Sequence, residues 1–225
     1  MPSFDIVKKN NLSQSFKTSK VMADFDVGEE HVGEHFVGNI EYPKQWQIGL
    51  IVGGSGTGKS TIALELYKDA FKDDFIYPEK PVIDCIPCEN VEELERMFYA
   101  VGFGSVPSWL KPYSVLSNGE KMRVDLARQI MTKDFIVFDE FTSVVDRQVA
   151  KVICMALKKT LKKYPNKKFV AVGCHHDVIE FLQPDWCFNT DNMQQVFQFP
   201  HNENKNLQLE NAQSLSGEIL GAIII

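Results

Sequence analysis

The sequence predicts an α/β fold in which helices cover both faces of a mostly parallel central sheet. Short apolar runs, such as Ile48 to Val52 (IGLIV) and Lys168 to Cys174 (KFVAVGC), have the composition of fully buried strands. Amphipathic stretches separate these runs, and strands that alternate with helices are typical of a parallel sheet. A glycine-rich loop, Gly53 to Thr61 (GGSGTGKST), joins one run to a predicted helix.

Composition limits the class of protein. The 225 residues are 44% hydrophobic and 24% charged, which suits one globular domain with or without a small subdomain. A net charge of −6 argues against a surface dedicated to nucleic acid, although it permits a local basic patch. No apolar run approaches the roughly 20 residues of a membrane-spanning helix, and the first ten residues lack a signal-peptide core, so we expect a cytoplasmic protein. Five cysteines, an odd number, favour reduced thiols.

The N-terminal region is expected to form a β-rich layer. SFDIV and KVMADFDV, within residues 3–27, have strand-like composition, whereas residues 28–39 are expected to form a loop. His31 and His35 lie four residues apart near Glu29, Glu30 and Glu34, so a metal site is an alternative function for this loop. Its three glycines disfavour the rigid helix that would hold such ligands.

The rest of the chain alternates between predicted strands and helices. We expect a second parallel strand over VIDCI (82–86), helices over 90–101, 117–131, 148–164 and 177–182, and strands over 134–140, 168–174 and 186–188. These elements predict a domain over residues 1–190 with a small helical subdomain near 90–130. A polar tail over residues 191–225 ends in the apolar EILGAIII.

The glycine-rich loop matches the phosphate-binding pattern G-x-x-x-x-G-K-[ST] over its first eight residues. Such a loop curls so that successive N–H groups point at one anion, and the following helix adds its N-terminal dipole. Lys59 would reach the β- and γ-phosphates, the Ser60 hydroxyl would bind Mg²⁺, and Thr61 would lie near the α-phosphate. The predicted phosphate-binding residues are Gly53, Gly54, Ser55, Gly56, Thr57, Gly58, Lys59, Ser60 and Thr61.

An apolar run that ends in two acids provides the second motif. In FIVFDE, Asp139 and Glu140 follow the predicted strand. Such a pair is expected downstream of a P-loop, with Asp139 holding Mg²⁺ and Glu140 polarising the attacking water.

A third motif points to a family. Leu116 to Glu120 (LSNGE) resembles the LSGGQ signature of ABC-type ATPases, with Asn118 for the first glycine and Glu120 for the glutamine. Ser143 to Asp146 (SVVD) resembles the D-loop of that family, and Cys174 to Asp177 (CHHD) resembles its switch-histidine element. Either His175 or His176 could be the switch residue.

The resemblance implies an ABC-type fold, with ATP and Mg²⁺ as cofactors, and an ATPase that works as a homodimer. Two subunits would enclose two ATP molecules, each between one P-loop and the partner's Ser117, Asn118, Gly119 and Glu120, with Asp146 crossing the interface. Glu140 would orient water, and Lys59 and a switch histidine would neutralise developing charge. Phe16, in NLSQSFK, would stack on adenine.

The partner driven by hydrolysis stays open. DEFTSVVD and KFVAVGCHHDVIEFLQPDW resemble compact bacterial and phage ABC ATPases joined to acetyltransferase-like domains, which implies a partner protein or a nucleic-acid process. The alternatives are the ATP-binding subunit of a membrane transporter and a nucleotide-gated binding module with little turnover. No glutamine occurs between Ile62 and Leu116, where the Q-loop of the family would lie, which weakens the transporter alternative. Asp84 or Glu89 could substitute for it.

Two other groupings allow more than one interpretation. Cys85 and Cys88 (CIPC) are either buried thiols or half of a zinc or redox site, with Cys174 and His175 as further ligands. The lysines between Lys158 and Lys168 are either a solvated face or a contact for nucleic acid or another acidic partner.

Overall fold

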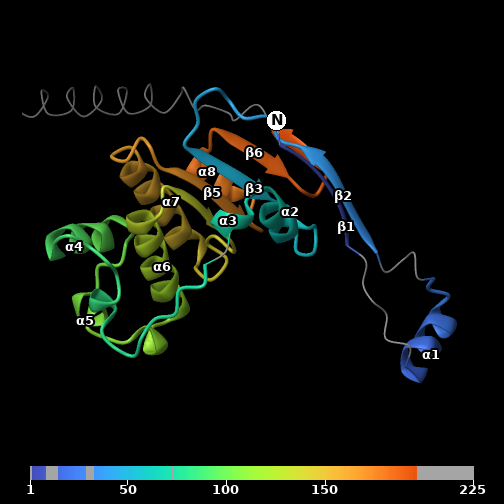
Figure 1. Cartoon of the computed structure of the whole chain (residues 1–225), viewed down its shortest axis with the longest axis horizontal. Coiled ribbons are helices and arrows are strands. Elements are labelled where there is room, and N and C mark those ends of the chain that lie inside the picture. Colours follow the sequence, from blue (N-terminus) through green and yellow to red (C-terminus); the bar gives the residue numbers. More distant parts are fainter. Residues whose placement is uncertain (1, 9–14, 29–32, 72, 197–225) are drawn as a thin grey trace, which may run out of the picture.

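A mostly parallel sheet with the strand order β4-β5-β3-β6-β7 forms the centre of the molecule (Figure 1). The computed structural model describes residues 2–8, 15–28, 33–71 and 73–196. The parallel strands are β4 (Phe135–Phe138), β5 (Lys168–Gly173), β3 (Ile48–Val52) and β6 (Trp186–Asn189), and β7 (Gln194–Val196) pairs antiparallel with β6. The predicted α/β fold is confirmed, and the sheet continues past residue 190 to Val196.

One face of the sheet is covered by α2 (Lys59–Leu66) and by an N-terminal hairpin. In the hairpin, β1 (Ser3–Lys8) pairs antiparallel with β2 (Glu34–Asn39). Phe4 and Phe36 from the hairpin and Ile62 from α2 are buried in one core cluster with strand residues such as Ile51. The prediction of a strand over SFDIV is confirmed.

The opposite face is covered by helices. Leu50 of β3 belongs to a core cluster with residues of α4 (Val91–Ala100), α6 (Asn118–Thr132), α7 (Arg147–Leu161) and α8 (Asp177–Leu182). These four helices were all expected from the sequence. Figure 1 also shows the short helices α3 (Lys68–Phe71) and α5 (Val106–Trp109). No helix in the described ranges has both the length and the apolar character needed to cross a membrane.

Three N-terminal and central predictions are wrong. KVMADFDV is not a strand, because Ser15 accepts a hydrogen bond from Thr18 N and starts α1 (Phe16–Phe25). Residues 34–39 are not a loop, because they pair with β1. VIDCI is not a parallel strand: Val82–Asp84 forms a 3-10 turn that is closed by a hydrogen bond from Asp84 N to Pro81 O.

The close approach of Trp186 to β3 explains a glycine inside a buried strand. Gly49 is the register partner of Trp186 in the β3–β6 pair. The indole of Trp186 lies over Gly49 so closely that an added Cβ would overlap its ring atoms. The same indole also contacts Tyr42 and Trp46, with ring centroids 5.2 and 5.6 Å away. Trp186 therefore fixes the packing of β3, β6 and the segment before β3.

We expect Gly49→Ala to lower the free energy of unfolding by about 1–3 kcal/mol, because the indole must leave its position. Urea unfolding measures this loss. Gly104→Ala is the matched control, because a Cβ there would meet only Tyr99 at an ordinary 3.8 Å. Equal stabilities of the two variants would contradict the steric role of Gly49.

Candidate functional site

The glycine-rich loop lies between the end of β3 and the start of α2. Gly56 and Gly58 have φ angles of 81° and 85°, a region that favours glycine, and Gly58 caps α2. Lys59 is only 8% exposed, and its Nζ donates to Gly54 O at 2.5 Å. The ammonium thus folds back over the loop, where phosphate oxygens could take the place of that carbonyl.

Asp139 and Ser60 lie side by side at the same edge of the sheet. Ser60 Oγ donates to Asp139 Oδ1 at 3.1 Å, and Asp139 Oδ1 also accepts from Glu140 N at 2.9 Å. A hydroxyl and a carboxylate are oxygen ligands suited to Mg²⁺, which keeps several waters beside its protein ligands. The two residues that the sequence assigned to Mg²⁺, 79 positions apart in the chain, therefore form a pair that fits the ion.

Glu140 is exposed and takes up a left-handed conformation, with φ of 52°. Ser143 holds this turn, because its N and Oγ both donate to Glu140 O, at 3.1 and 2.8 Å. Phe141 N bonds to Val172 O at 2.8 Å and returns the chain to the sheet. The strained turn fixes the position of Glu140, the predicted general base, beside the predicted Mg²⁺ residue Asp139.

The two histidines differ in their surroundings. His176 Nε2 lies 3.2 Å from Asp191 Oδ2, and Asp191 Oδ1 accepts from Gly54 N at 2.7 Å. His175 lies near Asp177, whose pKa is lowered mainly by hydrogen bonds from Arg147 and in smaller part by His175. Among the contacts of the described residues, a carboxylate therefore connects His176, and not His175, to the P-loop.

The turn after β6 is the part of the site that the sequence analysis missed. Besides the Asp191 contact, Thr190 Oγ1 lies 2.5 Å from Thr57 Oγ1 and presses against Gly53. The available signal was weak: the sequence predicts a strand over residues 186–188, and a parallel strand ends at the edge of the sheet that holds the P-loop.

Ser117 to Glu120 form the start of α6. Ser117 Oγ accepts from Glu120 N at 3.3 Å, and the Glu120 carboxylate accepts from Ser117 N at 3.0 Å, which completes a capping box. A hydrogen bond from Ser108 of α5, then those from Ser117, lower the pKa of Glu120. Asn118 is exposed and Gly119 half-buried. This helix start therefore lies against α5.

Asp146 caps α7. Its Oδ1 accepts from the N–H groups of Gln148 and Val149 at 3.0 and 2.9 Å. The carboxylate expected to cross a dimer interface thus fixes a helix start within its own chain.

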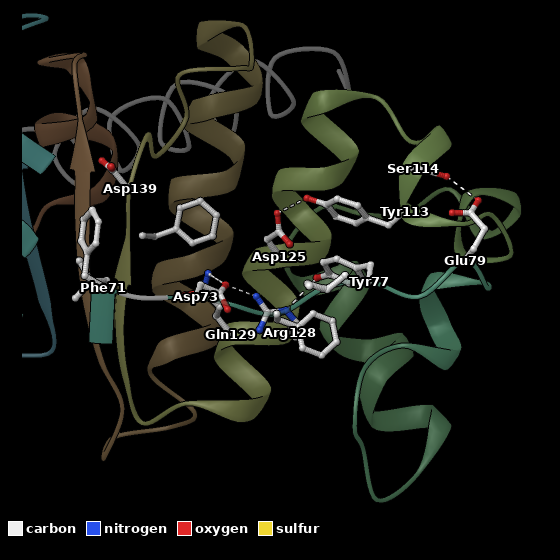
Figure 2. Close-up of a pocket in the computed structure, with 14 residues that line it drawn as sticks. Phe71, Asp73, Tyr77, Glu79, Tyr113, Ser114, Asp125, Arg128, Gln129 and Asp139 are labelled. Atoms are coloured by element: carbon white, nitrogen blue, oxygen red, sulfur yellow. Dashed lines mark hydrogen bonds and ion pairs between the residues drawn. The ribbon is translucent and has the colours of Figure 1, made fainter. Parts of the chain in front are cut away.

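A cavity of about 620 Å³ adjoins Asp139 (Figure 2). The segment after α3 forms one wall, and α6 forms another. The acids lining it together with Asp139 are Asp73, Glu79 and Asp125, and neither Asp84 nor Glu89 is among the lining residues. Asp73 belongs to the segment after α3 that lines the cavity together with Asp139. Its carboxylate accepts from Gln129 Nε2 at 3.0 Å and pairs with Arg128.

The structure does not bring Phe16 to the P-loop. Phe16 is the first residue of α1, is 83% exposed, and belongs to a helix that lies apart from α2 in Figure 1. His35 bonds to Asp5 at 2.6 Å within the hairpin, whereas His31, Glu29 and Glu30 lie outside the described residues. Within the described part of the chain, no three His, Cys, Asp or Glu side chains gather as a metal site, and Cys85 is buried while Cys88 is exposed.

We expect Ser117→Ala to raise the pKa of Glu120 toward 4.5 and to lower stability by about 1 kcal/mol at pH 7. Because the folded protein has the lower pKa, the stabilisation from ionised Glu120 is present above pH 4.5 and is lost as the pH falls through the folded pKa. NMR titration of the Glu120 carboxyl and urea unfolding at two pH values measure both effects. Ser114→Ala, at a serine bonded only to Glu79 in the described hydrogen bonds, is the control. An unchanged Glu120 pKa in Ser117→Ala would contradict the capping box.

Solved structures share the overall fold of this chain, although no family model and no curated protein matches the sequence. The dimeric ATP-binding cassette MJ0796 in a post-hydrolysis state with ADP and Pi has a TM-score of 0.58 and 14% identity over 88% of this chain and 98% of that chain. The protein cbiO1 from Clostridium perfringens, part of the ABC transporter complex cbiONQ, has a TM-score of 0.55 and 18% identity over 85% and 94%. At these identities the likeness concerns the fold, and the chain has the fold of an ABC ATP-binding cassette.

Proposed function

We propose that this chain binds ATP with Mg²⁺ and hydrolyses its β–γ anhydride as a pair of identical subunits. The observation that carries the proposal is the hydrogen bond of 3.1 Å between Ser60 and Asp139, beside a loop across which Lys59 is folded. A phosphate-binding loop and an oxygen pair for Mg²⁺ at one sheet edge are the two parts that phosphoryl transfer requires.

Each residue of the site would have a defined task. Ser60 and Asp139 would hold Mg²⁺, which supplies positive charge to the phosphate oxygens when bound. Glu140 would orient the attacking water and accept its proton, while Lys59 would stabilise charge on the leaving phosphates. His176 is the better candidate for the switch histidine, because it is linked to the P-loop through Asp191.

The second copy would complete the site. The start of α6 offers backbone N–H groups and the Ser117 hydroxyl, which suit a phosphate oxygen. Within its own chain the start of α6 contacts α5. In the proposed pair, the second subunit would bring its own α6 start to the nucleotide. The dimeric state of the cassette MJ0796 supports this arrangement. Hydrolysis would then open the pair and drive a partner.

The ATP-binding subunit of a membrane transporter is the second candidate, because cbiO1 is part of a transporter complex. The two structural similarities described above add no support for an acetyltransferase-like protein or a nucleic acid as partner, so these partners are inferred from the sequence resemblance alone. A membrane protein that co-purifies with the full chain in detergent would favour the transporter.

Glu140→Gln tests the hydrolytic role. We expect turnover to fall about 100-fold while ATP binding persists, because the water loses its base. An ATP-dependent dimer should then accumulate in analytical ultracentrifugation. Glu92→Gln, at an exposed position on α4, removes an equal charge and should leave both unchanged. Wild-type protein that binds ATP without turnover would favour the nucleotide-gated module instead.

Ser117→Arg tests completion of the site by a second copy. A bulky cation in the proposed interface should abolish the ATP-dependent dimer and turnover, while one ATP still binds each separate P-loop. Equilibrium binding and ultracentrifugation measure the two effects. An intact dimer with full turnover in Ser117→Arg would contradict the arrangement.

A further inference from the structure

The turn after β6 holds Asp191 in a fixed place beside the P-loop. Thr190 N donates to Val52 O at 2.8 Å, which continues the parallel pairing one residue beyond β6. Asp191 N donates to Asn189 Oδ1 at 2.8 Å, which closes the turn. The position of the Asp191 side chain therefore depends on the end of β3, the strand from which the P-loop starts.

One oxygen of Asp191 holds the first turn of the P-loop. Asp191 Oδ1 accepts from Gly54 N at 2.7 Å, a short distance typical of a hydrogen bond to a charged acceptor. Thr190 Oγ1 packs against Gly53 in the same turn, so closely that a Cβ at Gly53 would overlap it. The phosphate-binding motif already requires a glycine at position 53. The structure shows a second reason, because the Thr190 hydroxyl occupies the space that a side chain would need.

The other oxygen of Asp191 reaches the histidine loop. Asp191 Oδ2 lies 3.2 Å from His176 Nε2, although His176 follows β5 and Asp191 follows β6. In the sheet, β5 and β6 flank β3 on opposite sides, so this contact spans the P-loop. The two side chains are 50% and 39% exposed, so the pair adds little stability, and its effect is on orientation.

We propose that Asp191 is a positioning residue of this site: its carboxylate holds the first turn of the P-loop and the ring of His176 in a fixed relative position. The inference rests on the proposed ATPase function and deepens it. An acceptor at Nε2 fixes the ring and favours the tautomer that carries its proton at Nε2. In this proposal Asp191 would act on the phosphate and the water through the P-loop and His176, the two elements that its carboxylate contacts.

The contact is tested first in the nucleotide-free full chain by NMR. In Asp191→Ala, we expect the Gly54 amide proton to move upfield and the ring ¹⁵N shifts of His176 to change, while those of His175 stay the same. Asp134→Asn removes a charge from an 89% exposed side chain before β4, at the other end of the parallel strands, and should leave all three signals unchanged. Unchanged Gly54 and His176 signals in Asp191→Ala would overturn the inference.

Kinetics test the consequence. Asp191→Asn keeps an acceptor for Gly54 N but removes the charge facing His176, so we expect kcat to fall about tenfold, with the ATP dissociation constant changed less than about twofold. Asp191→Ala should also weaken ATP binding several-fold. In a His176→Ala background, Asp191→Asn should lower kcat no further, because both residues act through one ring.

The outcomes separate two failures. Wild-type protein without ATP turnover would overturn the proposed function and, with it, the role of Asp191 in catalysis. Active wild-type protein with an unchanged kcat in Asp191→Asn would overturn the role of Asp191 alone. Additive losses in the double variant would show that Asp191 does not act through His176.

Discussion

The pairing of β3 with parallel strands on both sides is the constraint on which the site depends. Val52, the last residue of β3, is in register with Gly173 of β5 and Asn189 of β6. Because all three strands run in one direction, the turns that follow them must leave the sheet at the same edge. The P-loop, His176 and Asp191 come from those three turns, so the register of the sheet brings them together.

The same strand also joins the two halves of the core. Leu50 contributes to the cluster with the helices α4, α6, α7 and α8, and its neighbour Ile51 to the cluster with α2 and the hairpin. Both side chains are fully buried. A strand covered on both faces must be apolar at every position, which explains the run IGLIV, and only the crowding by Trp186 requires glycine within it.

Local signals made much of the structure predictable. Helices α4, α6 and α7 begin where the side chains of Asn90, Ser117 and Asp146 accept hydrogen bonds from backbone N–H groups two or three residues later. Such caps can be recognised from a few neighbouring residues in the sequence. The errors arose where the structure of a segment depends on contacts with residues that are distant in the sequence. Strand β2 exists because residues about 30 positions earlier pair with it, and the role of Asp191 depends on Gly54, 137 residues away. The P-loop and the acids after β4 were predictable, but the turn after β6 that contacts the P-loop was not.

The segment over residues 73–79, in the region where no glutamine occurs, connects helix α6 to the edge of the sheet that carries Asp139. Arg128 of α6 is only 4% exposed, donates to Tyr77 at 3.1 Å and pairs with Asp73 (Figure 2). Withdrawing Asp73 would leave a buried cation without its counter-charge, which costs several kcal/mol. The segment beside Asp139 and helix α6 are therefore held as one unit, and α6 is the helix whose start carries Ser117. A displacement of α6 must either carry that segment with it or break this ion pair, so a movement of the helix that the proposed dimer would contact is coupled to the shape of the cavity beside Asp139.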